Sequence, residues 1–207
     1  LIKPIGAWVL REACHQMVAW DVAGLVVPRL AVNLSARQFE QQTLLTEVND
    51  VLAATGLPPA LLELEITESM LMQNPQEAVL LLGELKALGV KLSIDDFGTG
   101  YSSLSTLKRF PLDYLKVDRS FIEGLPADED SAAITEAIIA MARKLHFTVT
   151  AEGVETAAQG AFLRHAGCAI LQGYFFSKPL CSAELAQWLA ARQQQVPLLV
   201  GEGDDEL

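Results

Sequence analysis

The stretch KLSIDDFGTGY, residues 91–101, begins as a β-strand and ends as a glycine-rich loop, with two adjacent aspartates at the junction. Because side chains alternate across a strand, Asp95 and Asp96 point to opposite faces unless the strand ends there and the turn redirects the second carboxylate. Two carboxylates this close repel each other and favour a nearby cation. Two interpretations stay open at this point: the pair binds cations, or it caps a helix that begins near Ser102.

The same strand character recurs along the chain, where short β-rich runs alternate with longer amphipathic stretches. This alternation is typical of parallel βα units. The six predicted strands lie at 30–33, 62–66, 92–94, 114–117, 147–151 and 169–171. The predicted helices include 4–17, 77–88, 132–145 and 182–195. Glycines at 56, 89 and 167 follow helical runs at positions where a left-handed cap is expected.

Within each predicted strand, one set of alternate side chains is apolar and the other set ends in a polar group. The polar residues at these strand ends are Asn33, Glu65, Asp95, Asp118, Glu152 and Gln172. In a closed parallel barrel one set packs under the helices and the other faces the axis, with active sites at the carboxyl ends of the strands. An open doubly wound sheet also has polar strand ends, but the single consistent phase favours the barrel. The predicted fold is α/β, a TIM-like (β/α)8 barrel.

Composition bounds the class of protein. The chain has 207 residues, 51% of them hydrophobic and 20% charged, which suits one large core. Its net charge of -11 argues against a broad surface for duplex DNA or RNA. The three cysteines, Cys14, Cys168 and Cys181, fit neither a disulfide framework nor a zinc motif, which favours the reducing cytoplasm. The sequence contains neither an apolar run near eighteen residues nor an export leader.

The strand-end residues form a candidate metal site because they supply oxygen ligands without histidine, which favours magnesium or manganese over zinc. Two such ions about 3.5–4 Å apart, bridged by Asp95, would activate a water and neutralise a phosphate, and Asp96 could hold the second ion. Lys116 lies on the same phase, where it could orient the water or simply neutralise surplus carboxylates. Two interpretations of Gln172 are equally good: it forms hydrogen bonds at the strand end, or it contacts a ligand.

The loop at 97–103 and Glu68, which flank these strand ends, each have two possible interpretations. The loop at 97–103 has two glycines and small hydroxyls, which suits either a segment that moves over a site or a plain connection. Glu68 could accept hydrogen bonds from that loop, or could be an acid at a helix N-terminus. Residues 199–207 are expected to be a disordered acidic tail that follows the folded region 1–198.

Taken together, these motifs resemble the EAL family of bacterial cyclic-di-GMP phosphodiesterases. The matching stretches are VNLS (32–35), ELEITE (63–68), DDFGTGYSSL (95–104), LKVD (115–118), AEGVE (151–155) and QGY (172–174). They span almost the entire chain. The resemblance implies a TIM-like barrel that hydrolyses one phosphodiester of cyclic-di-GMP to give linear pGpG, using Mg²⁺ or Mn²⁺.

The resemblance also implies a role for each matching residue. Metal ligands would be Asn33, Glu65, Asp95, Asp118 and Glu152, with Asp96 serving the second metal. Catalysis would rest on Lys116, which positions the attacking water, together with Asp95 and Glu152. Substrate contacts would come from Gln172, Gly153 and Pro179. Glu68 would anchor the loop that follows the aspartates, and Glu155 would support the site without coordinating.

One departure from the family is informative. The signature Glu-Ala-Leu, whose glutamate is a metal ligand, does not occur in the chain, and neither does the arginine that follows it and reaches a substrate phosphate. A full barrel of this kind has about 250 residues, so the chain is expected to be the C-terminal ~80% of the domain, with the first strands and first helix upstream of Leu1. The isolated fragment is then expected to be weakly active or inactive.

Several expectations concern the longer protein. Upstream sensor or GGDEF-type domains, a homodimer formed through the EAL domain, and membrane attachment through segments outside this chain are all compatible with the resemblance. Two other functions compete with hydrolysis of cyclic-di-GMP. One is a non-catalytic module that binds the dinucleotide as a sensor. The other is a two-metal phosphatase with an unrelated substrate, which the same site chemistry would permit.

Overall fold

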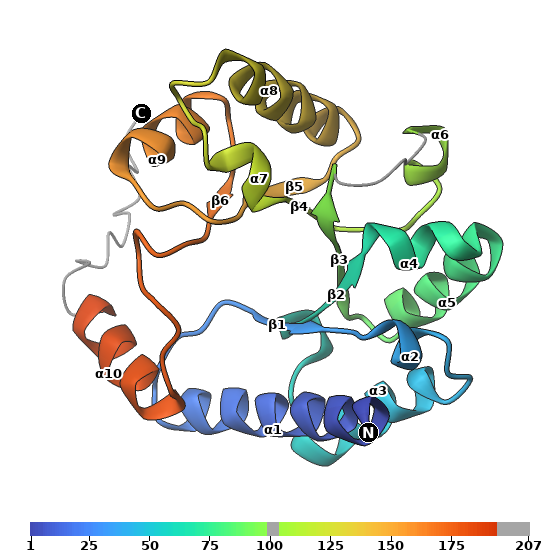
Figure 1. The fold of residues 1–207 in the computed structure, drawn as a ribbon. Coiled ribbons are helices and arrows are strands. Elements are labelled where there is room, and N and C mark those ends of the chain that lie inside the picture. Colours follow the sequence, from blue (N-terminus) through green and yellow to red (C-terminus); the bar gives the residue numbers. More distant parts are fainter. Residues whose placement is uncertain (99–103, 194–207) are drawn as a thin grey trace, which may run out of the picture.

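A computed structural model describes residues 1–98 and 104–193, which form a curled parallel sheet surrounded by helices (Figure 1). The sheet has six strands in the order β1-β2-β3-β4-β5-β6, so each strand pairs with its neighbours in sequence. The strands are β1 (Leu30–Asn33), β2 (Leu62–Thr67), β3 (Lys91–Phe97), β4 (Tyr114–Val117), β5 (Thr148–Ala151) and β6 (Ile170–Leu171). This arrangement confirms the six predicted strands and their parallel pairing, with β1 and β6 at the sheet edges in the described part of the chain.

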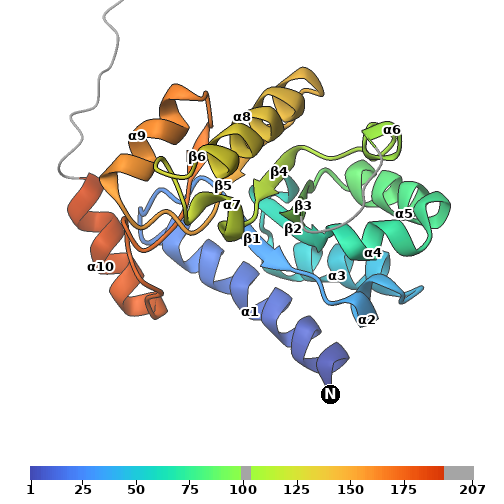
Figure 2. The same ribbon diagram turned by 45° about the horizontal axis from the view of Figure 1, so that its top comes forward.

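Helices cover the outside of this curled sheet in both views (Figures 1 and 2). They are α1 (Ile2–Val22), α2 (Ala36–Phe39), α3 (Leu44–Thr55), α4 (Glu68–Gln73), α5 (Pro75–Ala87), α6 (Leu104–Leu107), α7 (Arg119–Ile122), α8 (Glu129–Lys144), α9 (Ala157–His165) and α10 (Ser182–Gln193), with a short 3-10 turn at Pro59–Leu61. Strands and helices alternate as in a TIM-like barrel, which confirms the predicted fold class.

Local chemistry explains where the long helices begin. Helix α5 starts at Pro75, because proline lacks the N–H that a first-turn residue leaves unused. Helix α8 starts after Asp128, whose carboxylate accepts a hydrogen bond from Ser131 N at 3.0 Å. Both helices therefore begin two or three residues before their predicted starts at 77 and 132. The predicted glycine caps are confirmed, with φ of 73° at Gly56, 94° at Gly89 and 86° at Gly167.

The two faces of the sheet differ as the alternation predicts. The outward set is apolar, and nine of its side chains are at most 1% exposed: Leu62, Leu64, Ile66, Leu92, Ile94, Leu115, Val117, Val149 and Ala151. Burial of each Leu or Ile side chain under the helices stabilises the fold by about 1.5–3 kcal/mol. The inward set contains six polar side chains that are nevertheless buried: Glu63, Glu65, Ser93, Asp95, Lys116 and Thr150. A buried polar axis is costly unless its groups are paired, so these residues define the region where chemistry is expected.

Some predictions concern residues outside the described ranges. The loop after Gly98, the helix start near Ser102 and the acidic tail at 199–207 fall wholly or partly among residues 99–103 and 194–207. Within the described ranges, no helix combines the length and the hydropathy needed to cross a membrane.

Candidate metal centre

A bulge in β3 aims both aspartates at the same region. Ile94 pairs with Leu115 and Phe97 with Val117, so β3 advances three residues while β4 advances two. The extra residue breaks the strict alternation, and Asp96 adopts a left-handed φ of 54° that is unusual for a side chain other than glycine. Such a conformation costs about 1–3 kcal/mol and commonly marks a functional site. The bulge thus supplies the redirection of the second carboxylate that simple alternation would prevent.

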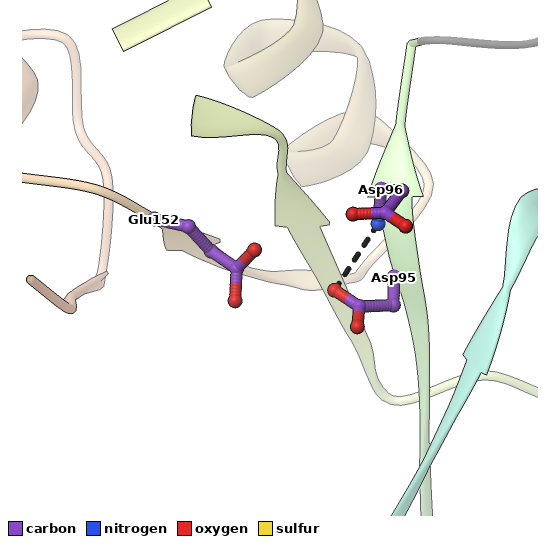
Figure 3. A group of neighbouring side chains, drawn as sticks. All are labelled: Asp95, Asp96 and Glu152. Atoms are coloured by element: carbon purple, nitrogen blue, oxygen red, sulfur yellow. Dashed lines mark hydrogen bonds between the residues drawn. The ribbon is translucent and has the colours of Figure 1, made fainter. Parts of the chain in front are cut away.

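Three carboxylates converge at the carboxyl ends of β3 and β5 (Figure 3). Asp95, Asp96 and Glu152 each offer one oxygen, and these oxygens all lie within 4.8 Å of one another. Asp95 is buried, Glu152 is half-buried and Asp96 is exposed. The backbone N–H of Asp96 also donates to Asp95 Oδ1 at 3.1 Å, which fixes the orientation of the buried carboxylate. The group is therefore open to solvent at Asp96 and buried at Asp95.

Lys116 lies among these carboxylates and is itself buried. Its Nζ lies 2.7 Å from Glu152 Oε1, 2.8 Å from Glu65 Oε1 and 3.0 Å from Asp95 Oδ1. One ammonium thus faces three carboxylates from three different strands, which leaves two negative charges uncompensated within this group. We call Glu65, Asp95, Asp96 and Glu152, with Lys116, the acidic cluster.

The pKa directions express this imbalance. Burial raises the pKa of Glu65 and of Glu152 above the ordinary value, and repulsion from Asp95 adds to it, although Lys116 acts in the opposite direction. The pKa of Asp96 is raised by burial and by the negative charges of Asp95 and Asp118. Burial alone would lower the pKa of Lys116. The negative charge of Glu65 and the hydrogen bond to Glu152 outweigh the effect of burial, so the pKa of Lys116 is raised.

These properties fit a divalent cation. A buried group of oxygens with excess negative charge and raised pKa values is stabilised when a cation replaces the missing positive charge. All the donor atoms are oxygens, which suits Mg²⁺ or Mn²⁺ better than softer metals. The cation interpretation of Asp95 and Asp96 is therefore favoured. Both residues belong to β3, and the first described helix after them, α6, begins only at Leu104.

Two further predicted ligands lie at neighbouring strand ends. Asn33 is the last residue of β1 and pairs in register with Glu65 of β2. Asp118 follows β4 and is the N-cap of α7, where its Oδ1 accepts a hydrogen bond from Ser120 N at 3.0 Å. The capping role and a ligand role are compatible, because a carboxylate has two oxygens. Metal ligation by Asn33 and Asp118 remains a prediction.

Glu68 contacts the segment that follows the aspartates. It is the first residue of α4, it is 3% exposed, and its Oε2 accepts a hydrogen bond from Gly98 N at 3.0 Å. Both sequence readings of Glu68 therefore have a structural counterpart: it is an acid at a helix N-terminus and it holds the exit of β3. Whether this contact governs the activity remains a prediction.

The residues predicted to contact substrate lie beyond β5 and β6. Gln172 and Pro179 line a cavity of about 590 Å³ between the exit of β6 and α10, together with Tyr174, Lys178 and Trp188. Gly153 directly follows Glu152, in a left-handed conformation with φ of 70°. Glu155 points to a different partner, because its Oε1 lies 3.0 Å from Nη2 of Arg119.

Sequence reasoning missed Arg119 and Gln159. Arg119 pairs with Glu155, and Gln159 is a buried amide that binds backbone groups on both sides of it. A signal for Arg119 was present in the stretch LKVDR, where it directly follows Asp118. The spacing of Thr156 and Gln159, a threonine followed three residues later by glutamine, is the signature of a capping box at the start of α9 and could have marked Gln159. Its contacts with the carbonyls of Ile122 and Glu123, 37 and 36 residues earlier in the chain, had no such signal.

The fold and the acidic cluster define a class: TIM-like β/α proteins with an oxygen-rich cation site at the carboxyl ends of their strands. The family is also clear. The sequence model of the EAL domain matches residues 1–179, and the chain belongs to the EAL domain family.

Individual relatives agree with this assignment. The chain is 51% identical over 191 residues to the cyclic di-GMP phosphodiesterase NbdA of Pseudomonas aeruginosa, covering 92% of this chain and 24% of the relative. It is 48% identical over 185 residues to the bifunctional diguanylate cyclase/cyclic di-GMP phosphodiesterase MucR of the same species, covering 89% and 27%. The chain thus spans about a quarter of the length of these curated relatives.

A solved structure shows the same architecture. The cyclic-di-GMP complex of the PaMucR phosphodiesterase superposes with a TM-score of 0.86 at 48% identity, over 89% of this chain and 75% of that one. The EAL domain of Mycobacterium smegmatis DcpA also superposes, with a TM-score of 0.84 at 38% identity, over 90% of this chain and 84% of that one. The open parallel sheet described here therefore corresponds to part of the TIM-like barrel of an EAL domain.

Proposed function

We propose that the protein containing this chain hydrolyses one phosphodiester of cyclic-di-GMP to give linear pGpG, in bacterial second-messenger signalling. The observation that carries the proposal is the acidic cluster, in which three buried or half-buried carboxylates face the single ammonium of Lys116. The names of relatives such as NbdA, at 51% identity, support the choice of substrate.

The metal ligands in this proposal are Asn33, Glu65, Asp95, Asp118 and Glu152, with Asp96 at a second ion. Bound Mg²⁺ or Mn²⁺ would supply a water of lowered pKa and would neutralise charge on the phosphate. The protein's own contribution is to hold the oxygens in place. Lys116 does this from the centre, and its protonated Nζ also offers positive charge where a phosphoryl oxygen would become more negative.

The substrate side of the site extends toward β6 and α10. Gln172 offers an amide donor and acceptor, and Pro179 and Trp188 offer apolar surface in the same cavity of about 590 Å³. A purine base combines a flat apolar face with a polar edge, which matches such a lining. Gly153 would allow the backbone after Glu152 to approach the ligand closely.

The test is hydrolysis of cyclic-di-GMP by the purified protein with and without Mg²⁺, with pGpG resolved by ion-exchange chromatography. Asp95→Asn should lower turnover by about 10²–10³-fold, because the neutral amide removes a charge that acts in the transition state. Asp130→Asn, on the surface of α8, is the matched control and should retain activity. Equal turnover by Asp95→Asn and the unsubstituted protein would contradict the proposal.

A second function is a non-catalytic module that binds cyclic-di-GMP. The position that distinguishes it from the enzyme is the glutamate of the family's Glu-Ala-Leu signature, which is expected upstream of Leu1: another residue at that position would favour the binding module. The same assay separates the two functions when it is combined with equilibrium binding. Saturable binding of cyclic-di-GMP without formation of pGpG, in the longest form of the protein that contains this chain, would establish the module instead.

We further propose that the longer protein joins this domain to sensor or GGDEF-type domains, pairs as a homodimer, and presents the domain to the bacterial cytoplasm. The name of MucR, which combines a diguanylate cyclase with a phosphodiesterase, supports a multidomain arrangement. Light scattering at several protein concentrations would test the dimer, since a constant monomer mass would contradict it.

A further inference from the structure

Helix α7 touches the exits of two strands that carry the acidic cluster. Gly98 follows the aspartates of β3 and Gly153 follows Glu152, and both have left-handed φ angles, of 102° and 70°. A Cβ added at Gly98 would lie 2.7 Å from Cε2 of Phe121, and one at Gly153 would lie 2.5 Å from Cγ of Arg119. Glycine is needed at both positions, because side chains of α7 lie directly against the backbone there. Side chains of α7 thus contact both exits, and Figure 1 shows α7 beside the end of β5.

Arg119 adds an ionic contact to this packing. Its Nη2 lies 3.0 Å from Oε1 of Glu155 and 3.5 Å from Oε1 of Glu123. The arginine and Glu155 side chains are 52% and 44% exposed, so the pair contributes little to global stability. Its effect is geometric: the aliphatic part of Arg119 covers Gly153 while the guanidinium binds Glu155, so two points of the segment after Glu152 are held by one side chain.

Gln159 holds the same segment from the other side. It is 5% exposed, and its Oε1 accepts hydrogen bonds from the backbone N–H of Glu155 at 2.8 Å and of Thr156 at 2.9 Å. Its Nε2 donates to the carbonyl of Ile122, the last residue of α7, at 3.1 Å. The segment from Glu152 to Thr156 is therefore fastened to both ends of α7, by Arg119 at the start and by Gln159 at the end.

We propose that Arg119 is a positioning residue, which, together with Gln159, sets the place of Glu152 relative to Asp118 and Lys116. The inference rests on the proposed function, because it assigns Arg119 an effect on metal binding and turnover. Asp118 caps the helix that begins with Arg119, so movement of α7 changes its distance to Glu152. Residues that orient metal ligands without binding the metal typically change affinity or activity by about 10–100-fold when substituted.

The experiment compares Arg119→Ala, which removes both contacts, with Arg119→Met, which keeps the part of the side chain that covers Gly153 and removes the charge. Glu155→Gln removes the same ion pair from its other end. Glu123→Gln is the matched control, since Glu123 is the more distant and more exposed partner of Arg119. Amide hydrogen exchange of the metal-free protein, Mn²⁺ affinity by electron paramagnetic resonance, and kcat and KM for cyclic-di-GMP are measured for each.

Arg119→Ala should accelerate exchange of the amides of residues 152–156, weaken Mn²⁺ binding by about 10-fold and lower kcat with KM unchanged. Arg119→Met and Glu155→Gln should show smaller changes of the same sign. Glu123→Gln should have the exchange rates, Mn²⁺ affinity and kcat of the unsubstituted protein, and all four variants should keep its melting temperature. Faster exchange with normal Mn²⁺ affinity and kcat overturns the inference, and so does no change at all. If the unsubstituted protein neither binds Mn²⁺ nor turns over substrate while Arg119→Ala still exchanges faster, the proposed function fails but Arg119 still fixes the segment.

Discussion

Two ionic groups lie at opposite ends of the same sheet and have opposite charge balance. At the amino ends, Asp113 accepts hydrogen bonds from Lys86 Nζ at 2.8 Å to each of its oxygens, from Lys91 Nζ at 3.3 Å and from Leu92 N at 2.9 Å. At the carboxyl ends, the ammonium of Lys116 contacts three carboxylates of the acidic cluster, those of Glu65, Asp95 and Glu152. One group has two cations for a carboxylate, and the other has three carboxylates for a cation.

The pKa directions follow from this difference. Burial would raise the pKa of Asp113, but its hydrogen bonds to Lys86 and the Leu92 backbone outweigh burial and lower it. The carboxylates of Glu65 and Glu152 are shifted upward instead. A group whose charge is fully satisfied stabilises the fold. A group that keeps excess charge at the mouth of a parallel barrel is instead prepared for a ligand that brings the opposite charge.

The largest expected difference between the two groups is in stability. Lys116→Met removes the ammonium that contacts three carboxylates and should lower the free energy of unfolding of the metal-free protein by about 3 kcal/mol, as measured by urea unfolding. Mn²⁺ should restore part of that loss. Lys86→Met, the control at the other end, should cost only about 1 kcal/mol, because Asp113 keeps Lys91 and Leu92. An equal loss in both variants would remove the distinction between the groups.

A smaller effect is expected from Asp113→Asn. The substitution weakens the contacts of Lys86 and Lys91 and should lower the free energy of unfolding by about 1–2 kcal/mol. Because Asp113 lies at the opposite end of the sheet from the acidic cluster, Mn²⁺ affinity and kcat should stay at the values of the unsubstituted protein. A tenfold loss of Mn²⁺ affinity in this variant would show that the two ends are coupled.

The smallest expected effect is the pH dependence of the metal-free protein. The folded-state pKa values of Glu65 and Glu152 are raised, so the folded protein binds protons more readily than the unfolded chain at these groups, and stability falls as pH rises through their folded pKa values. Asp113 has a lowered pKa, so its contribution is present above the unfolded value and is lost only as pH falls through the folded one.

Acidification from neutral pH toward the unfolded carboxylate pKa should therefore raise the melting temperature. A rise of about 2–4 °C, which corresponds to 1 kcal/mol in a chain of this length, is the expected scale. The double variant Glu65→Gln, Glu152→Gln should flatten this dependence. If the slope is the same in the double variant, other groups are responsible for it.

Much of this comparison could be predicted from local sequence. Alternation in the strands predicted which side chains face the axis, because period-two patterning is a property of each strand alone. The expectation that Lys116 neutralises surplus carboxylates agrees with its three ion pairs. The predicted starts of α5 and α8 were two and three residues too late. Pro75 and Asp128 determine where these helices begin, and the prediction relied on the apolar pattern alone.

What the sequence did not predict depends on contacts between distant segments. The bulge at Asp96 exists because β3 and β4 pair out of simple register, and a single strand does not contain that information. Arg119 covers the backbone of Gly153, and Gln159 donates to the carbonyl of Ile122, so each contacts the backbone of another βα unit, where the identity of the contacted residue gives no sequence signal. Long-range geometry of this kind decides how the predicted ligands are oriented, although it does not decide which residues they are.

The most direct test of the account is a Mn²⁺ titration of the metal-free protein at neutral pH, followed by calorimetry, with Asp95→Asn and Asp113→Asn in parallel. The account predicts saturable binding with proton release by the unsubstituted protein and by Asp113→Asn, and binding at least about 10-fold weaker by Asp95→Asn. Equal affinity in all three proteins, or no binding by the unsubstituted protein, would contradict the claim that excess carboxylate charge at the carboxyl ends of the strands forms a cation site.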